Sequence, residues 1–438
     1  MTATATRTVG VRKLVAGNVV ARLGALGALG LATVMVARVG GPANVGAFTL
    51  LRVLPGLAGV LAAAGLPGAV PYFLAARSDD RRLRSTVAAM TCLGATVATA
   101  GWLLLTPVLH RVFFEHWSTG LVVAGGLAVF SQLYVAVGKA LLQGSGDLRG
   151  ANVAIVFEEA AFLPVYALLL PWRHGFAWTG NGTGGSGGSG TLVAALVLAD
   201  VVVAIGIAER LRRSGFFRGW ARPSYRLARE VGAYGARGQL GGLLSLVNLR
   251  LDVAILGAIA GPAVLGVYAI ASKYAELLRL PGLAVTYVMY PSFARRADGD
   301  ARVRTSALLP RAFWLNVVAA TPLALVAGVV LPMVYGRAFG AATLPADILL
   351  LGLLGESVAG LVTAYLYGVG RPGLNSLAIG AGVVVTVVGD LLLIPHYHAV
   401  GAAIASACAY ATTCATLLVC FAVNGATVGR RKVLGRTA

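Results

Sequence analysis

The sequence predicts an all-α polytopic membrane protein whose helices form two six-helix lobes. Three observations predict it: an apolar composition, a series of apolar runs long enough to cross a bilayer, and an internal repeat. Of the 438 residues, 58% are hydrophobic and 12% are charged, whereas soluble domains carry about 25% charged residues. A chain of this composition cannot cover its surface with polar groups in water, so we expect it to reside in a membrane.

The formal net charge of +20 is large enough to raise the question of nucleic-acid binding. The basic residues, however, lie between long apolar runs, where they orient helices in a membrane, so we expect no nucleic-acid partner. The four cysteines all lie inside apolar runs and form no CxxC pair. They indicate neither a metal site nor a disulfide framework.

Twelve apolar runs are long enough for membrane spans, because a helix needs about 20 mostly apolar residues to cross the hydrocarbon layer. Prolines inside the second and eighth runs predict bends in those helices. The predicted spans are 14–37, 45–75, 85–108, 119–143, 151–171, 191–208, 235–258, 264–291, 306–332, 344–367, 375–394 and 400–423.

The distribution of Lys and Arg predicts the orientation of these spans. With the N-terminus in the cytoplasm, twenty-four basic residues fall in cytoplasmic segments and four fall in outer loops. This asymmetry follows the positive-inside rule. We therefore expect a multi-pass protein of the cytoplasmic membrane with both termini in the cytoplasm. The four outer residues are Arg38, Arg111, Arg173 and Arg337.

A long basic segment separates the two predicted lobes. Residues 209–230, ERLRRSGFFRGWARPSYRLARE, alternate Arg with Phe and Trp, as an interfacial helix on anionic lipids does; a solvated loop is the alternative. The predicted organisation is an N-terminal lobe (1–208), a basic amphipathic cytoplasmic linker (209–234), a C-terminal lobe (235–423) and a basic cytoplasmic tail (424–438).

An internal repeat relates the two predicted lobes. GPANVGAF at 41–48 returns as GPAVLGVY at 261–268, and LLLP at 168–171 returns as LLIP at 392–395. The matches fall at equivalent places among the spans, the first pair in the loop between the first two spans of each lobe. Six spans per lobe give both lobes the same orientation, hence a parallel pseudo-two-fold repeat. Two such lobes leave a cleft between them, which is an alternating-access architecture.

Five basic residues lie deep within predicted spans, where each charge costs about 2.5–3.5 kcal/mol on insertion scales. They fall on the first two spans of each lobe, and two acids and two asparagines accompany them. We expect them to form a cationic lumen that binds an anion; structural ion pairing, for instance of Lys273 with Glu276, is the alternative. The basic residues are Arg22, Arg52, Arg250, Lys273 and Arg279, and the supporting polar residues are Asn18, Asn248, Asp252 and Glu276.

Other acidic residues in the spans are candidates for ion coupling. A carboxylate in a low-dielectric interior can carry a proton or bind Na⁺. One of them could couple transport to a H⁺ or Na⁺ gradient, and the sequence does not distinguish among them. We expect no other cofactor. The candidates are Glu158, Glu159, Asp200, Glu356 and Asp390.

The motifs resemble the polysaccharide-biosynthesis (O-antigen-type) flippases of the multidrug/oligosaccharidyl-lipid/polysaccharide exporter superfamily. The resemblance rests on ARVGGPANVGAF, LRVLPGLAGVLAAAGLPGAVPYF, LLLIPHYHAVGAAIASACAY and the segment from VNLRLD to YPSFAR. It implies a central V-shaped cavity between the lobes, lined by the first, second, seventh and eighth spans, which carry the five deep basic residues.

The resemblance also implies a function without catalytic residues. Such flippases move polyprenyl-pyrophosphate-linked oligosaccharides to the outer leaflet by alternating access, for cell-surface polysaccharide biosynthesis. It implies glycosyltransferases and a polymerase of the same pathway as further partners. The alternatives are a flippase for peptidoglycan lipid precursor or a teichoic-type polymer, a multidrug exporter, and a membrane enzyme. The peptidoglycan-precursor family carries an Arg-Asp pair where this chain has Ala28 and Leu29.

Overall fold

In the part of the chain that the computed structural model describes, every regular element is a helix. The structure describes residues 2–77, 80–115, 117–170, 187–219, 221–280, 298–369 and 371–434. Within these ranges, nine helices are long and apolar enough to cross a membrane. Three of them contain one non-helical residue each, at Gly41, Gly261 and His398. Counting each of these three helices as two segments gives twelve segments within the described residues, which agrees with the prediction of about twelve spans.

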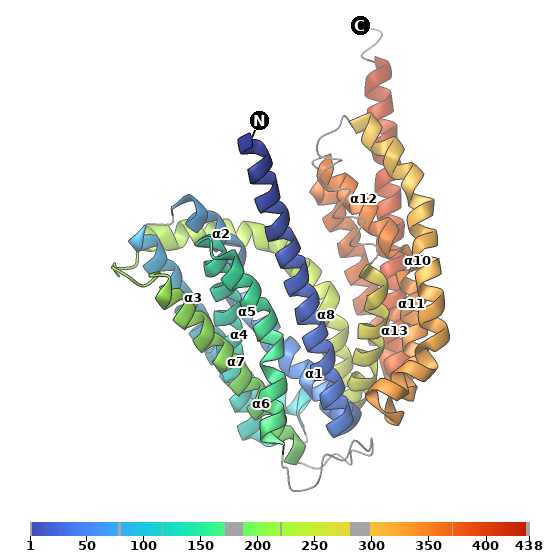
Figure 1. Cartoon of the computed structure of the whole chain (residues 1–438). Coiled ribbons are helices and arrows are strands. Elements are labelled where there is room, and N and C mark those ends of the chain that lie inside the picture. The colour runs from blue at the N-terminus through green and yellow to red at the C-terminus, as the bar shows by residue number, and fades with distance from the viewer. Residues whose placement is uncertain are drawn as a thin grey trace. The chain divides into compact units, whose positions relative to one another are not determined.

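The chain divides into two compact units, Met1–Leu243 and Leu244–Ala438. Figure 1 shows the helices of each unit side by side as a bundle. The boundary lies within α8 (Tyr225–Ala275), whose first turns belong to unit 1. Residues 209–234, predicted as a linker, comprise the end of α7, the connection that follows it and the start of α8.

Unit 1 is built around α4, which packs against α2, α3 and α7, while α1 packs against α4 and α5. Three aromatic rings fill its interior: Phe48 lies 4.9 Å from Phe162, and Phe162 lies 5.1 Å from Tyr166, between ring centroids. All three side chains are almost fully buried. The helices besides α8 are α1 (Thr2–Ala63), α2 (Leu66–Ala76), α3 (Arg81–Phe113), α4 (Thr119–Gly144), α5 (Leu148–Ala160), α6 (Phe162–Leu169) and α7 (Gly187–Arg213).

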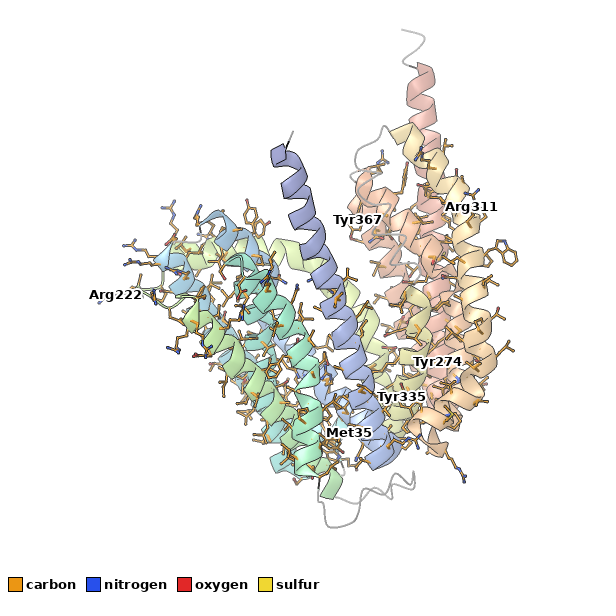
Figure 2. The ribbon with its side chains drawn as sticks, viewed as in Figure 1. Met35, Arg222, Tyr274, Arg311, Tyr335 and Tyr367 are labelled. Carbon is orange, nitrogen blue, oxygen red and sulfur yellow. The ribbon has the colours of Figure 1, made fainter. Side chains whose placement is uncertain are left out.

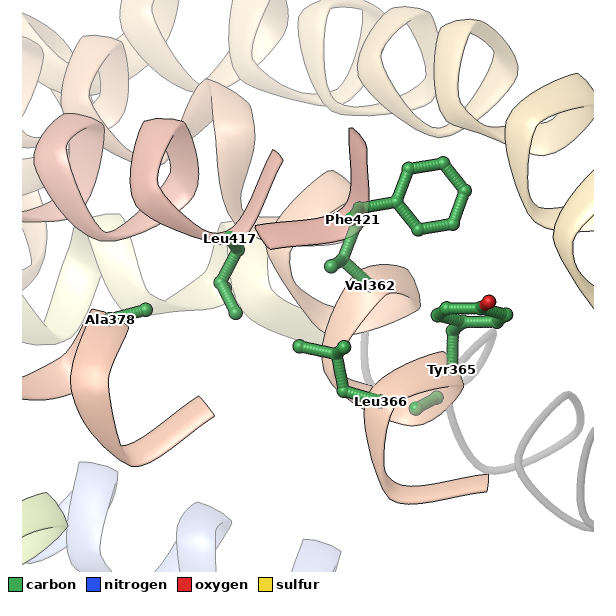
Figure 3. Close-up of a cluster of buried hydrophobic side chains, with 7 residues drawn as sticks. Val362, Tyr365, Leu366, Ala378, Leu417 and Phe421 are labelled. Atoms are coloured by element: carbon green, nitrogen blue, oxygen red, sulfur yellow. The ribbon is translucent and has the colours of Figure 1, made fainter. Parts of the chain in front are cut away.

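In unit 2, α13 packs against α11 and α12, and α10 packs against α12. Figure 3 shows the cluster between α12 and α13, where Val362 and Leu366 meet Leu417 and the Tyr365 ring meets Phe421 edge to face at 5.0 Å. After α8, the elements are the 3₁₀ helix η2 (Glu276–Leu278), α10 (Asp298–Tyr335), η3 (Arg337–Ala342), α11 (Thr343–Gly352), η4 (Leu353–Gly355), α12 (Glu356–Gly368) and α13 (Pro372–Leu434).

The repeated Gly-Pro-Ala sequence forms the same kink twice. Gly41 has φ 65° and ψ −165°, and Gly261 has φ 78° and ψ 175°. This region of backbone conformation is essentially restricted to glycine. Pro42 and Pro262 follow at the first position of the next helical segment, where a missing N–H costs nothing. The predicted loop is therefore a one-residue kink, and the sequence repeat is a repeat of backbone geometry.

A second repeat lies where α4 and α12 end, at Gly144 and Gly368. The amide of Asp147 donates to the carbonyl of Leu142 at 2.9 Å. The amide of Arg371 donates to the carbonyl of Leu366 at 2.8 Å. Asp147 and Arg371 are 224 positions apart, as are the repeated sequences LLLP (168–171) and LLIP (392–395). Such six-residue closures satisfy carbonyls that a helix end leaves without partners.

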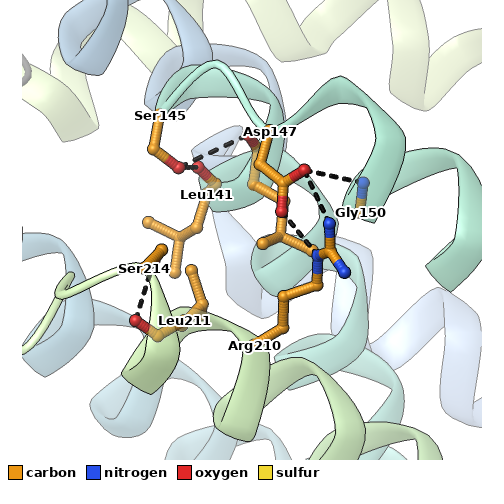
Figure 4. A network of polar contacts seen from close by, with 8 residues as sticks. Leu141, Ser145, Asp147, Gly150, Arg210, Leu211 and Ser214 are labelled. Atoms are coloured by element: carbon orange, nitrogen blue, oxygen red, sulfur yellow. Dashed lines mark hydrogen bonds and ion pairs between the residues drawn. The ribbon is translucent and has the colours of Figure 1, made fainter.

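Asp147 starts the next helix and also joins it to α7, as Figure 4 shows. Its carboxylate accepts the amide of Gly150 at 2.9 Å and pairs with Arg210, whose Nε lies 2.5 Å from Oδ2. The hydrogen bond from Arg210 lowers the pKa of Asp147. The equivalent residue in unit 2 is Arg371, so the two units share the backbone hydrogen bond but not the side-chain contact.

We expect Asp147→Ala to lower the free energy of unfolding at neutral pH by about 1–2 kcal/mol, since it removes a helix cap and a solvent-screened ion pair. Because the pKa of Asp147 is lowered by folding, this contribution is present above the ordinary carboxyl pKa and disappears as acidification protonates the folded protein. Thermal unfolding of the purified protein measures the effect. Asp147→Asn, which keeps a capping oxygen, is the control with a smaller loss; equal stability of Asp147→Ala and the unchanged chain would contradict the assignment.

Candidate functional site

Arg52 in unit 1 forms a bidentate ion pair. It lies on α1, and its Nη2 is 2.7 Å from Oε1 and 2.6 Å from Oε2 of Glu159 on α5. The guanidinium also lies 5.4 Å from the centroid of the Phe48 ring. The side chains of Arg52 and Glu159 are 26% and 18% exposed. The pair is thus mostly withdrawn from solvent, and Glu159 already occupies part of the anion-binding capacity predicted for Arg52.

A second ion pair lies beside the first. Lys139 on α4 pairs with Glu158 on α5. Asp200 on α7 accepts a hydrogen bond from Ser131 on α4 at 3.4 Å. The three acids predicted for ion coupling in this unit therefore each have a polar partner. Sequence spacing did not reveal the role of Lys139, because its partner is on the following helix.

Arg22 differs from Arg52 in its surroundings. Its side chain is exposed, and its Nε donates to Asn18 one helical turn earlier at 3.0 Å. Asn18 in turn donates to Asn152 on α5 at 2.9 Å. No ion pair among the described residues involves Arg22. Asn18 therefore orients Arg22 while the rest of its guanidinium can bind an anion.

Unit 2 carries the other three predicted basic residues. Arg250 is exposed, and Lys273 and Arg279 are partly buried. Arg279 lies 3.8 Å from Glu356, and its guanidinium stands 5.2 Å from the centroid of the Tyr410 ring. Its buried Nε has no hydrogen-bond partner among the described residues. Glu276, from the predicted supporting set, is exposed, and the side chain of Asn248 lies outside the described residues.

The interior of unit 2 contains a polar network on α8 and α13. The hydroxyl of Tyr268 donates to Oδ2 of Asp252 at 2.5 Å and lies 3.0 Å from the hydroxyl of Ser406. Asp390 is fully buried on α13, and neither of its carboxylate oxygens has a hydrogen-bond partner among the described residues. Asp252 lies close enough to interact with it electrostatically. Two carboxylates therefore lie near each other with a hydroxyl partner for only one of them.

The five acids predicted as coupling candidates now fall into two groups. Glu158, Glu159, Asp200 and Glu356 each face a cation or a hydroxyl. Asp390 faces neither within the described ranges. An unpaired charge in such a position costs several kcal/mol, so a proton or a cation is needed to neutralise it. No cluster of three metal-ligating side chains occurs among the residues that the structure describes.

Sequence comparisons agree with the family resemblance. Residues 185–343 match the model of a family described as polysaccharide biosynthesis protein. A probable low-salt glycan biosynthesis flippase of Haloferax volcanii is 23% identical over 379 residues, which cover 85% of this chain and 75% of that protein. The resemblance predicted from the motifs is thereby confirmed.

Comparisons with solved structures establish the fold. An inward-facing multidrug resistance transporter of the MATE family, in the MOP superfamily, has a TM-score of 0.73 at 17% identity, covering 94% of this chain and 99% of that one. The lipid II flippase MurJ, in an inward closed conformation, has a TM-score of 0.73 at 11% identity, covering 94% and 87%. The chain has the two-lobe fold of these transporters and is a multi-pass membrane protein.

We expect Arg52→Met and Glu159→Met each to lower the free energy of unfolding by about 1–3 kcal/mol, because each leaves one charge of the pair buried alone. The double variant should recover part of that loss, since no unpaired charge remains. Thermal unfolding in nanodiscs gives the coupling energy as a double-mutant cycle. Arg311→Met, at an exposed arginine on α10 that Figure 2 labels, is the neutral control. Additive losses in the double variant would contradict the pairing.

Proposed function

We propose that this chain is a flippase that moves a polyprenyl-pyrophosphate-linked oligosaccharide across the cytoplasmic membrane for cell-surface polysaccharide biosynthesis. The observation that carries the proposal is the match of residues 185–343 to a polysaccharide biosynthesis family on a fold shared with transporters. The similarity to a glycan biosynthesis flippase over 85% of the chain supports the same substrate class.

The exposed arginines are the proposed ligands of the pyrophosphate. Arg22 in unit 1 and Arg250 in unit 2 are exposed, and no described ion pair involves either. A guanidinium binds phosphate oxygens through two parallel hydrogen bonds. Arg52 and Arg279 are held by Glu159 and Glu356, so they would bind substrate only after exchanging these partners. Lys273 completes the proposed basic set.

Topology and partners complete the proposal. The termini lie in the cytoplasm, as the distribution of basic residues predicts. Basic residues between α7 and α8, such as the exposed Arg222 in Figure 2, contact anionic lipid headgroups. Glycosyltransferases supply the substrate on the inner face, and a polymerase uses it on the outer face. The protein itself performs no covalent chemistry.

We expect Arg22→Gln and Arg250→Gln to reduce flipping at least tenfold, because each removes a charge-assisted contact to the pyrophosphate. Proteoliposomes loaded with a fluorescent polyprenyl-pyrophosphate oligosaccharide report the rate. Arg311→Gln is the matched control at an exposed arginine on α10. Unchanged rates in both variants would refute the binding role. Transport of a cationic drug or of a peptidoglycan precursor in place of the oligosaccharide would select one of the alternative functions.

Asp390 is the proposed coupling residue for a H⁺ or Na⁺ gradient, because its buried carboxylate has no described partner. Unit 1 supports this choice by contrast. By the offsets of the sequence repeat, Tyr166 stands 224 residues before Asp390 and Phe48 stands 220 residues before Tyr268, and both rings pack in an aromatic stack. The polar network would thus give unit 2 an ion site that unit 1 does not have at the equivalent place.

We expect Asp390→Asn to abolish gradient-driven flipping, since an amide neither takes up a proton nor neutralises a cation. Proteoliposomes with an imposed pH gradient, and separately a Na⁺ gradient, distinguish the two ions. Glu356→Gln, at an acid that faces Arg279, is expected to keep the response to the gradient. A full response in Asp390→Asn would remove Asp390 from the mechanism.

A further inference from the structure

A small cavity lies in unit 1 where α2 meets the first turns of α8. It has a volume of about 400 Å³, within the range of about 300–1,000 Å³ that small-ligand sites occupy. None of the candidate residues described above lines it. The lining residues are Tyr72, Phe73, Ala76 and Arg77 from the α2 side, and Glu230, Ala233 and Tyr234 from α8.

Close packing of two glycines fixes the two walls of this cavity. A Cβ atom on Gly65 would lie 2.1 Å from the carbonyl oxygen of Gly235, and one on Gly235 would lie 2.8 Å from that of Ala64. Gly65 also has φ 81°, a conformation that other residues rarely adopt. α2 and the start of α8 therefore lie side by side at backbone contact (Figure 1). This backbone contact sets the spacing of the two helices that line the cavity.

Aromatic rings form the floor of the cavity. Tyr72 and Tyr234 stack at 4.7 Å with an angle of 9° between their planes, and Phe73 meets Tyr234 edge on at 5.5 Å. Tyr72 is 58% exposed and Tyr234 is 44% exposed. Each tyrosine uses one ring face for the stack, so a large part of both rings is open to a ligand. The free face of a tyrosine ring, with the hydroxyl at its edge, suits a ligand ring that is apolar on its faces and polar at its edge.

Two opposite charges stand at the rim. Arg77 Nη2 lies 3.8 Å from Glu230 Oε1, with side-chain exposures of 49% and 45%. At that separation the two groups attract each other without a hydrogen bond, so the donors of Arg77 and the acceptors of Glu230 remain available. Their charges cancel, which disfavours a strongly anionic or cationic ligand. Neighbouring hydroxyls of a sugar offer a matching set of donors and acceptors.

The cavity also lies at the proposed cytoplasmic end of unit 1. α2 is followed by Arg77, Arg81, Arg82 and Arg84, and α8 is preceded by the basic connection from α7. The positive-inside rule assigns both segments to the cytoplasm. The glycan of a lipid-linked substrate is on that side before transport, since its lipid is in the inner leaflet.

We propose that this cavity binds a sugar ring of the oligosaccharide on the cytoplasmic side, before the pyrophosphate reaches the basic residues of the spans. The choice of a sugar as ligand rests on the proposed flippase function. The free face of the more exposed Tyr72 stacks on the C–H groups of the sugar ring, Tyr234 supports Tyr72 from its other face, and Arg77 and Glu230 bind hydroxyls of the sugar. The site would give the protein selectivity for a part of the glycan remote from the pyrophosphate.

The test measures, by saturation-transfer NMR, the binding of free sugars to the purified full-length chain in nanodiscs. The probes are galactose, N-acetylglucosamine, rhamnose and glucuronate, with an unrelated polyol as the negative probe. We expect at least one neutral sugar to bind, and Tyr72→Ala and Tyr234→Ala to weaken it about fivefold or more. Tyr72→Phe keeps the ring and should retain most of the binding. Tyr225→Ala is the matched control, since Tyr225 is 84% exposed on α8 and does not line the cavity.

The outcomes separate this inference from the proposed function. If the unchanged chain flips lipid-linked oligosaccharide but no sugar binds, or if Tyr72→Ala binds as the unchanged chain does, the inference is overturned and the flippase stands. If sugars bind at Tyr72 and no lipid-linked oligosaccharide is flipped, the proposed function falls and the sugar site remains. Because Tyr72→Ala could disturb the packing at Gly65, thermal unfolding of each variant is measured. The double variant Arg77→Gln, Glu230→Gln gives a second binding test on exposed side chains.

Discussion

Backbone hydrogen bonding in a medium without water is the constraint on which this structure depends. In the hydrocarbon layer every N–H and C=O must find a partner within the protein, so a spanning chain is helical and can depart from the helix only briefly. Gly41 and Gly261 make such departures in one residue each, by a backbone conformation that is open to glycine. The closures after α4 and α12 satisfy the carbonyls at those helix ends. Similar solutions in both units are what a duplicated six-helix lobe requires.

The same lack of water governs the charged side chains. A charge in this environment is either paired or exposed, because leaving it buried alone is costly. Arg52 with Glu159 and Lys139 with Glu158 are paired on neighbouring helices. Arg22 and Arg250 are exposed. The structure thus distinguishes basic residues that hold neighbouring helices together from basic residues that are exposed.

Spans and repeats were predictable because they are local or periodic in the sequence. The apolar runs predicted twelve spans, and the recurrence of Gly-Pro-Ala marked the two places where the helix is interrupted. Long-range pairing was not predictable. Nothing in the spacing of Arg52 and Glu159, 107 residues apart, shows that their helices pack together. Nor does the sequence show that Lys139 on α4 pairs with Glu158 on α5. The contact of Gly65 with Gly235 joins α2 to α8 across 170 residues. No sequence motif predicts this contact or the cavity beside it.

The two units repeat a glycine kink and a helix closure but have different interiors. At equivalent positions, unit 1 has Phe48, Phe162 and Tyr166 in one aromatic stack, whereas unit 2 has Tyr268, Thr386 and Asp390. Ala32 in unit 1 likewise corresponds to Asp252 in unit 2. An apolar stack stabilises its lobe regardless of ion concentration. A polar core whose carboxylate has no partner within the described part of the chain changes its free energy when a proton or cation binds. On the proposed coupling through Asp390, a duplicated fold would combine a lobe of constant stability with one that responds to an ion gradient, through the residues that differ between the repeats.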